Sequence, residues 1–324
     1  MFRYILRRCL SGVVTLLGIT FVTFIVVSLA PGDPAEMEVA RMQDGKVSDE
    51  LYQKIREYYN LDKPMPVQYA MWLGRIVRGD MGNSFHTGMN VSRTIGDAMI
   101  PTISVAMLSI FLTYLIAVPI GIFSAVRQGS LFDNIASTVV YMLYSVPPYV
   151  IGMLLILYFG VQLEWPFRGI VSDNYDELST FGKMRDVAFH YVLITTSFTA
   201  GSLAYYSRFT RQNLLEVTRN DYIRTARAKG LPEHVVILKH AFPNTLIPLI
   251  TLMSLTFPFI LSGSVIIETM FSWPGLGRLF YDSVMRRDYP TVMGLSVITA
   301  VLVLVITLLA DLAYALVDPR VTYD

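Results

Sequence analysis

The stretch MFRYILRRCLSGVVTLLGITFVTFIVVSLAPGDP, residues 1–34, decides the class of this protein. It carries three arginines in its first eight residues and then no charged side chain from Cys9 to Gly32. Such a run is long enough for a helix to cross a bilayer, which takes roughly 20 residues. It is too long for the apolar region of a cleaved signal peptide, and Pro31 follows the candidate cleavage residue Ala30. We therefore predict a transmembrane helix over residues 1–30 that is retained as an anchor.

Five more long apolar stretches follow along the chain. They cover about residues 98–126, 134–161, 187–207, 243–270 and 291–317, and each is near the length that a crossing helix needs. The 324-residue chain is 53% hydrophobic and only 16% charged, and its mean hydropathy is +0.49. These values are typical of a membrane protein. The predicted fold class is an all-α membrane protein with six transmembrane helices.

The loop between the fourth and fifth predicted helices is rich in cations. Short loops rich in Lys and Arg stay in the cytoplasm, so this loop and the arginine-rich N-terminus should share that side, and six crossings then place both termini there. Residues 31–97 become a small extracytoplasmic insert, with short helices expected at SDELYQKIREYY and PVQYAMWLGRIV, and residues 98–324 form the core domain. The charged residues of the loop are Arg208, Arg211, Arg219, Arg224, Arg227, Lys229 and Lys239 against Glu216, Asp221 and Glu233.

The sequence lacks the motifs of common enzymes. It has no G-x-x-x-x-G-K-[ST] nucleotide loop, no H-E-x-x-H and no G-x-S-x-G, so we predict no catalytic residue. The single cysteine, Cys9, and the four histidines form no cluster with metal-ligand spacing, so we predict no metal site. The formal net charge of +1 does not indicate nucleic-acid binding.

Three ionisable residues inside the predicted spans, Glu268, Asp311 and His190, are candidates for function because charges are costly at membrane depth. All three lie toward the ends of their spans. A carrier driven by an ion gradient is expected to hold carboxylates near the midplane, so this distribution argues against such a carrier. For Asp311 and His190 we favour a packing or interfacial hydrogen bond.

The loop DYIRTARAKGLPEHVVILKH, residues 221–240, predicts a helix, a tight corner and a second helix. Asn220 or Asp221 suits the N-cap of the first helix, Gly230 the residue after it, and Pro232 the first turn of the second helix. The loop therefore has a defined architecture between two apolar spans.

The first helix of this loop has a small-residue side. Tyr222, Ile223 and Ala226 fall there, while the arginines and the lysine spread over the rest. We interpret this narrow side as a face that docks into a groove. A loop that contacts anionic lipid is an alternative. A DNA-binding helix-turn-helix is a weaker one, because the second helix runs straight into a span and has little freedom to reach a DNA groove.

The residues DYIRTARAKGL followed by LKHAFPNTLIP resemble the cytoplasmic "EAA" loop of ABC importer permeases, in the form of the dipeptide/oligopeptide branch. The general pattern is Glu-Ala-Ala, three residues, Gly, nine residues and then Ile-x-Leu-Pro. Aligned on Gly230, the residues Ala226, Gly230 and Pro243 match it, and Arg224 stands where the pattern has Glu. Four other stretches resemble the same branch in the same order: RYILRR…APGDP, GDMGNSF, SGSVIIETMFSWPGLGRL and RRDYP.

The resemblance implies a subunit of the bacterial or archaeal inner membrane that forms half of a translocation pathway for short peptides. It implies that segment 214–243 seats a coupling helix in a groove of a separate cytoplasmic ATPase, which binds ATP and Mg²⁺, so that this chain needs no cofactor. The implied partners are a second permease subunit, usually a different chain, one or two ATPase subunits, an extracytoplasmic substrate-binding protein and membrane lipid. The ATPase-coupling candidates are Asp221, Tyr222, Arg224, Thr225, Ala226, Arg227, Lys229, Gly230 and Leu231.

On the outer side, Glu268, Phe271 and Trp273 are the pathway or gate candidates. Trp72 and Phe85, together with Phe271 and Trp273, are candidates for the surface that meets the binding protein. Anchoring at the membrane interface is the alternative for each aromatic residue.

Three alternatives are considered. The same branch includes permeases for nickel, glutathione or oligosaccharides, and the spans contain no mark of a peptide site. A secondary carrier driven by an ion gradient would work without an ATPase. A membrane enzyme would need a nucleophile and a base that the sequence does not supply.

Overall fold

The structure is a computed structural model that describes residues 2–29, 35, 49–58, 62–261 and 263–317. Within these ranges the chain is helical, and its only bridge of β type joins Asn83 and Asn90. The α-helices are α1 (Phe2–Ser28), α3 (Asp49–Tyr58), α4 (Met65–Val77), α5 (Val91–Val126), α6 (Leu131–Ser145), α7 (Pro148–Leu155), α8 (Thr180–Val217), α9 (Asp221–Ala228), α10 (Glu233–Val235), α11 (Phe242–Leu261), α12 (Val265–Met270), α13 (Leu276–Met285) and α14 (Tyr289–Val317). Two π-helical segments, Ile156–Gln162 and Val236–Ala241, and a short 3₁₀ helix, Tyr175–Glu177, complete the set.

Five helical segments of the described chain are long and apolar enough to cross a membrane. They are Leu6–Ser28, Val91–Val126, Thr180–Val217, Glu233–Met253 and Tyr289–Leu312. The pair Leu131–Ser145 and Pro148–Gln162 passes the same criterion but is bent by 95°. The prediction of an all-helical membrane protein is confirmed, with a sixth span only if the bent pair counts as one.

Two of the predicted spans are interrupted helices in the structure. Residues 134–161 break between α6 and α7, because Val146 is extended (φ −98°, ψ 124°) before Pro147. A residue that precedes proline is pushed out of the helical region, and proline cannot donate a helix hydrogen bond. Residues 243–270 divide into α11 and the separate helix α12, and Gly263, with φ +83°, lies between them. Glu268 therefore sits in a short helix of its own.

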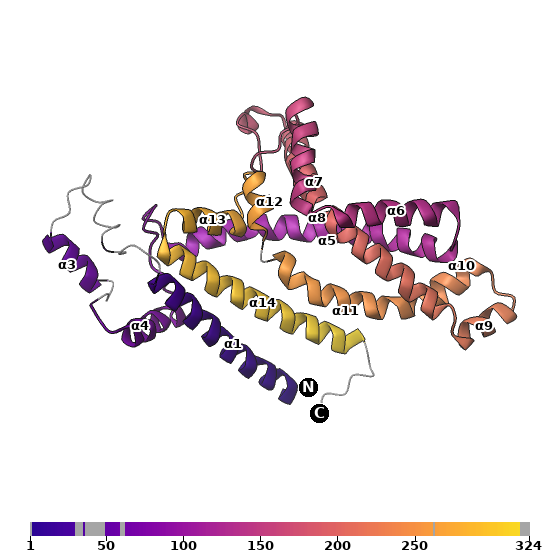
Figure 1. The fold of residues 1–324 in the computed structure, drawn as a ribbon, viewed down its shortest axis with the longest axis horizontal. Coiled ribbons are helices and arrows are strands. Elements are labelled where there is room, and N and C mark those ends of the chain that lie inside the picture. Colours follow the sequence, from indigo (N-terminus) through magenta and orange to yellow (C-terminus); the bar gives the residue numbers. More distant parts are fainter. Residues whose placement is uncertain (1, 30–34, 36–48, 59–61, 262, 318–324) are drawn as a thin grey trace.

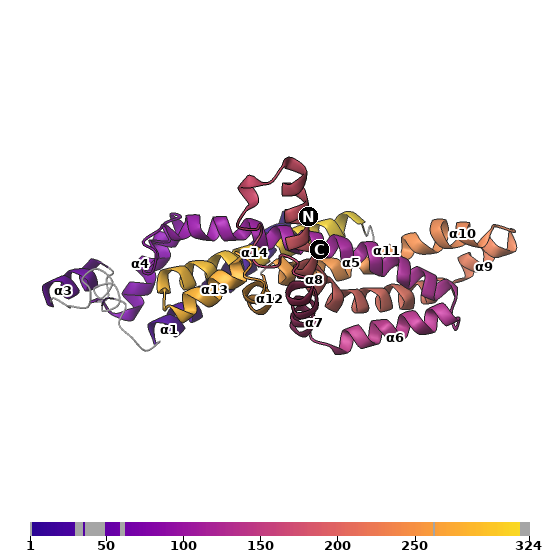
Figure 2. The same ribbon diagram turned by 90° about the horizontal axis from the view of Figure 1, so that it is seen from above.

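The helices form an elongated body with two different ends (Figures 1 and 2). The helices α9 and α10 lie at one end, and α3 and α4 lie at the other. The long helices α5 and α8 pack closely: a Cβ added at Gly121 would lie 2.6 Å from the Ser207 carbonyl oxygen. Along the other side α1 packs against α14, and Arg8 Nη2 lies 2.6 Å from Asp311 Oδ2.

Both helices expected in the insert are present as α3 and α4. The rings of Tyr69 and Trp72 on α4 pack against Phe24 on α1 at centroid distances of 5.4 and 6.1 Å. The Tyr69 hydroxyl also lies 3.0 Å from Thr20 Oγ1. Trp72 thus fixes α4 to the first span.

Candidate functional site

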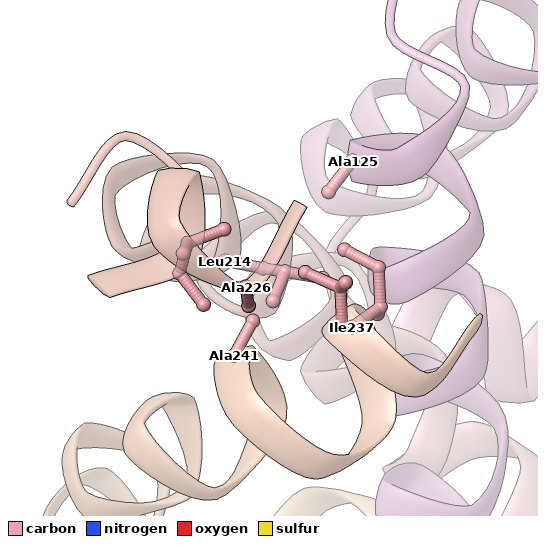
Figure 3. Packing of buried hydrophobic residues seen from close by; sticks show 7 residues of the cluster. Ala125, Leu214, Ala226, Ile237 and Ala241 are labelled. Carbon is pink, nitrogen blue, oxygen red and sulfur yellow. The ribbon is translucent and has the colours of Figure 1, made fainter. Parts of the chain in front are cut away.

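The helix α9 is held by an apolar seat made by its own chain (Figure 3). Ile223 is fully buried and Ala226 is 6% exposed, and both face the end of α8 and the π-helical segment that follows α10. Burying these side chains stabilises the position of a helix that is only eight residues long, since such a helix is marginal by itself. The seat consists of Ala125, Leu214, Ile223, Ala226, Val236, Ile237 and Ala241.

Ile223 and Ala226 of the small-residue side of α9 therefore point into the protein, whereas Tyr222 stays exposed, so the interpretation of Ile223 and Ala226 as part of the docking face was wrong. Ala226 permits close approach, but to the chain's own helices. The face that remains open is the polar one, with the Arg224 side chain 74% exposed. Its contact within the chain is a 3.5 Å approach to Asp221 Oδ1, which lies one turn away on the same helix. The outward set is Asp221, Tyr222, Arg224, Thr225, Arg227, Lys229, Gly230 and Leu231.

The corner after α9 has its glycine where predicted, but Pro232 is the N-cap of α10 and not a residue of its first turn. Asn220 is the N-cap residue, Lys229 is the C-cap, and Gly230 follows with φ +73°, a conformation that other residues adopt only with strain. Arg227 clamps the corner from outside: its Nη2 and Nε donate to the two Glu233 carboxylate oxygens at 2.7 and 3.1 Å. These bonds raise the pKa of the Arg227 guanidinium above its usual range. The pair stays charged and holds the two helices at a set angle.

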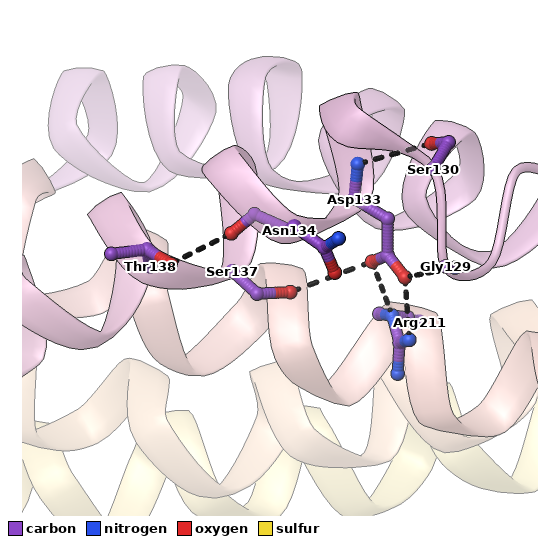
Figure 4. Close-up of polar contacts among 7 residues, drawn as sticks. All are labelled: Gly129, Ser130, Asp133, Asn134, Ser137, Thr138 and Arg211. Carbon is purple, nitrogen blue, oxygen red and sulfur yellow. Dashed lines mark hydrogen bonds and ion pairs between the residues drawn. The ribbon is translucent and has the colours of Figure 1, made fainter.

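A buried ion pair ties the seat of α9 to α6 (Figure 4). Arg211 on α8 donates from Nε and Nη2 to the two Asp133 oxygens, each at 2.8 Å. Asp133 is 2% exposed and also accepts from the Gly129 backbone N–H at 2.9 Å. Arg211 was expected only as a loop cation and Asp133 was not predicted, although an Asp three residues after the cap Ser130 is a recognisable helix-start signal.

In a second region, away from α9, Glu268 closes a polar network that we call the outer clasp, formed by Thr102, Glu268, Gly275 and Gly277. Glu268 is 2% exposed, and its Oε2 accepts from the backbone N–H groups of Gly277 and Arg278 at 2.7 and 3.1 Å. Thr102 on α5 donates to Glu268 Oε1 at 3.1 Å and accepts from the Leu276 N–H at 2.8 Å. A carboxylate at the first turn of α13 satisfies N–H groups that the helix cannot pair internally.

Glycine is required in the clasp because the Glu268 carboxylate lies so close. A Cβ at Gly275 would lie 2.5 Å from Glu268 Oε2, and one at Gly277 would lie 2.7 Å from the Ser264 carbonyl carbon and the Val265 nitrogen. The stretch WPGLGR thus wraps around the Glu268 carboxylate. The geometry gives Glu268 a structural role in joining α5, α12 and α13.

The aromatic gate candidates are interior residues. Phe271 and Trp273 are both fully buried, and the Trp273 ring meets Tyr191 edge-on at 4.7 Å. The Phe271 carbonyl accepts from the Gly169 N–H at 3.0 Å, which ties α12 to the segment between Ile156–Gln162 and α8. The expectation that these two side chains form an outer docking surface was wrong, because both are buried in an apolar cluster inside the protein. Phe85 is partly buried, and its backbone N–H donates to Asp288.

The two ionisable candidates for which packing was favoured have structural partners. Asp311 pairs with Arg8, and His190 Nδ1 lies 2.9 Å from the Asp186 carbonyl oxygen. Among the described residues no group of three or more His, Cys, Asp or Glu side chains could hold a metal ion.

Comparison with known proteins adds to this geometry. The family model described as "Binding-protein-dependent transport system inner membrane component" matches residues 117–323, and the model of the corresponding N-terminal region matches residues 1–106. The chain belongs to this family of ABC importer permeases.

Relatives of the permease match it along its whole length. The oligopeptide transport system permease protein AppB of Bacillus subtilis (strain 168) is 40% identical over 321 residues, 99% of both chains. The glutathione transport system permease protein GsiC of Pectobacterium atrosepticum is 37% identical over 323 residues, 100% of both chains. A structure of the MetNI methionine ABC transporter in an inward-facing conformation aligns with a TM-score of 0.55 at 19% identity, over 69% of this chain and 96% of that one. That likeness concerns the fold alone.

In the permease, two stretches that carried the family resemblance meet in space. The Asp288 carboxylate of RRDYP accepts from the Ser84 hydroxyl at 2.6 Å and the Phe85 N–H at 2.8 Å, both in GDMGNSF. It also accepts from Thr291 Oγ1 at 2.7 Å, in the first turn of α14. Sequence reasoning found the stretches but not their contact, which joins residues about 200 positions apart.

Proposed function

We propose that this permease forms half of the membrane pathway of an ATP-driven importer for short peptides and is driven through segment 214–243 by a separate cytoplasmic ATPase. One observation carries the proposal: α9 is fixed by an apolar seat while its charged face is left open. A surface loop that served only topology would not need a seat of buried side chains. When an ATPase groove that holds α9 moves, the seat should move with α9. That motion reaches two long helices, because Leu214 belongs to α8 and Ala241 leads into α11.

The proposal assigns the open face of α9 to the ATPase contact. Tyr222 and Leu231, 45% and 37% exposed, supply apolar area, and Arg224 and Lys229 supply charge for an acidic or polar rim. Gly230 and the Arg227 pair keep the corner rigid, so that motion of α9 reaches two spans. ATP and Mg²⁺ bind the ATPase subunits in this scheme.

The proposal includes an orientation and the division of the chain. Residues 1–30 are the anchoring helix, 31–97 the extracytoplasmic insert and 98–324 the core, with both termini in the cytoplasm. The ends of α1 and α14 that pair through Arg8 and Asp311 point toward the α9 end of the body, which supports this orientation (Figure 1). The partners are a second permease subunit, one or two ATPase subunits, an extracytoplasmic substrate-binding protein and membrane lipid; no nucleic acid is involved.

Short peptides are the proposed cargo because the relative AppB is named for oligopeptide transport. Glutathione is a second candidate, since the relative GsiC, of nearly equal identity and coverage, is named for it. Both cargoes carry amide groups and free carboxylates.

The proposal is tested by affinity purification of the permease from its own membranes, followed by reconstitution of the recovered assembly in vesicles. We expect an ABC ATPase to co-purify and to drive uptake of labelled dipeptides to pentapeptides that requires ATP and persists with ionophores. Uptake that follows an ion gradient without ATP would refute it. Competition by glutathione, nickel and oligosaccharides identifies the cargo class.

A further inference from the structure

The helices α6 and α8 share an open face that is aromatic and polar. On α8, Tyr205 is 44% exposed, and Arg208 and Gln212 continue the same face at helical spacing. On the antiparallel α6, Tyr141 and Tyr144 are 50% and 63% exposed. The Arg208 guanidinium lies over the Tyr141 ring at 5.3 Å. We call this surface, formed by Tyr141, Tyr144, Tyr205, Arg208 and Gln212, the tyrosine groove.

Three hollows follow one another along the groove. A hollow of about 60 Å³ lies beside Arg211 and Ser137, close to the buried ion pair. It shares Tyr141, Arg208 and Gln212 with a second hollow of about 260 Å³. The second shares Tyr144 with a third of about 490 Å³, which ends against Ile266 and Ile267 of α12. The groove thus runs from the α9 side of the body to the helix that the outer clasp holds.

The composition of the groove argues against contact with acyl chains. Arg208 lies nine residues before the end of α8, a 38-residue helix that is longer than a membrane span needs. A charged side chain at or beside a membrane span faces a protein partner or water rather than acyl chains. Among the described residues, the carboxylates that form ion pairs do so with other cations, and Arg211 is already neutralised by Asp133. Arg208 is therefore available to an anion from outside the chain.

The opposite face of α6 provides the contrast. Ile135, Val139 and Met142 are 54%, 48% and 64% exposed and repeat at helical spacing without any polar group. That composition suits lipid. One helix therefore separates an apolar face from the tyrosine groove.

We infer that the tyrosine groove is this permease's wall of the translocation pathway and binds peptides in transit, with Arg208 as the site for the terminal carboxylate. This inference rests on the proposed function. Guanidinium pairs with carboxylate through two parallel hydrogen bonds. The tyrosine hydroxyls and the Gln212 amide hydrogen-bond the peptide backbone, while the rings cover apolar side chains of any sequence. The groove therefore recognises what all short peptides share.

Cysteine accessibility tests the pathway assignment, because Cys9 is the only cysteine in the chain. In a Cys9→Ser background, single cysteines replace Tyr144 and Tyr205 in the groove, and Val139 and Met142 on the apolar face serve as matched controls. The complete assembly in vesicles is treated with a membrane-impermeant thiosulfonate. We expect groove cysteines to react at least tenfold faster than the controls, and a saturating transported peptide to slow that reaction.

Equal rates on the two faces, or groove rates that the peptide leaves unchanged, would overturn the inference and assign the surface to lipid or to the second permease. ATP-driven uptake by the Cys9→Ser assembly is measured in the same vesicles. Absence of that uptake would count against the proposed function instead.

Arg208 is tested with one peptide supplied as the free acid and as the C-terminal amide. Dividing the acid-to-amide ratio of uptake rates in the variant by the same ratio in the wild type cancels the preference of the binding protein, which is a separate chain. We expect Arg208→Gln to lower the acid-to-amide ratio about tenfold, the loss of one charge-assisted pair, and Arg208→Lys to keep most of it. An unchanged ratio in Arg208→Gln would show that Arg208 does not hold the carboxylate.

Discussion

Two regions of the permease, the α9 end and the outer clasp, treat their charged groups in opposite ways. At the α9 end, apolar side chains fill the seat and the cations face outward, with Arg224 touching little more than Asp221 on its own helix. In the outer clasp, the Glu268 carboxylate is enclosed and satisfied by Thr102 and by backbone N–H groups of α13. The α9 end leaves its charged surface open, whereas the polar groups of the outer clasp find their partners within one chain.

This difference separates residues that hold the fold from residues available to partners. A buried carboxylate with several donors cannot move without leaving donors unpaired, which costs about 1–3 kcal/mol for each buried group. An exposed arginine with a distant partner contributes almost nothing to stability. Substitutions at the outer clasp should therefore disturb folding, and substitutions on the open face of α9 should disturb energy coupling only.

The largest effect is expected for Gly277→Val. The new Cβ would meet backbone atoms of Ser264 and Val265 at 2.7 Å, and a backbone contact cannot be relieved by a rotamer change. We expect little monodisperse permease after detergent extraction, as measured by size-exclusion chromatography. Gly96→Val on α5 is the control, since nothing lies within 4 Å of its Cβ position. Equal yields of the two variants would show that the clasp tolerates rearrangement.

Next in size is Glu268→Ala, which leaves the Gly277 and Arg278 N–H groups without their acceptor. We expect a loss of about 2 kcal/mol and a fall in the apparent Tm of the purified assembly of about 4–8 °C. Asp282→Asn, on an α13 side chain that is 41% exposed, should leave the Tm within about 1 °C. If the Glu268→Ala protein were as stable as the wild type but transported differently, Glu268 would act in the pathway and not as a structural residue.

The seat of α9 is tested by Ala226→Trp against Ala228→Trp on the same helix. Ala226 is buried in the seat and Ala228 is exposed. Overpacking at position 226 should destabilise the seat by about 1–3 kcal/mol and displace α9. We expect uptake and substrate-stimulated ATPase activity to fall severalfold more than in Ala228→Trp. A larger loss of uptake and ATPase activity in Ala228→Trp than in Ala226→Trp would contradict the importance of the seat for coupling.

The smallest effect on stability is expected for the double variant Arg224→Ala, Lys229→Ala. Its Tm should match that of the wild type, within about 0.5 kcal/mol of stability, because both side chains are exposed. Peptide-stimulated ATPase activity should nevertheless fall severalfold, through loss of contacts with the ATPase. Arg93→Ala, at the outer end of α5, is the control and should change neither property. Full coupling in the double variant would remove the two cations from the proposed contact.

The sequence by itself established the class of the protein and its family. Long uncharged runs, cationic loops and the corner at Gly230 are local signals, because they depend on residues that are close together in the chain. The corner was predicted with its glycine in the right place, and the structure has φ +73° there. The helices α3 and α4 of the insert were predicted for the same reason.

Only the tertiary structure decided which neighbours those residues meet. An apolar position in a membrane protein can face lipid, a partner or the core, so the pattern alone could not show that Ala226, Phe271 and Trp273 are interior. The partners of Glu268 and Asp288 are backbone and hydroxyl groups, some of them far away in the chain and common in any sequence. Periodicity shows that a helix has two faces, and three-dimensional packing determines which of them remains open.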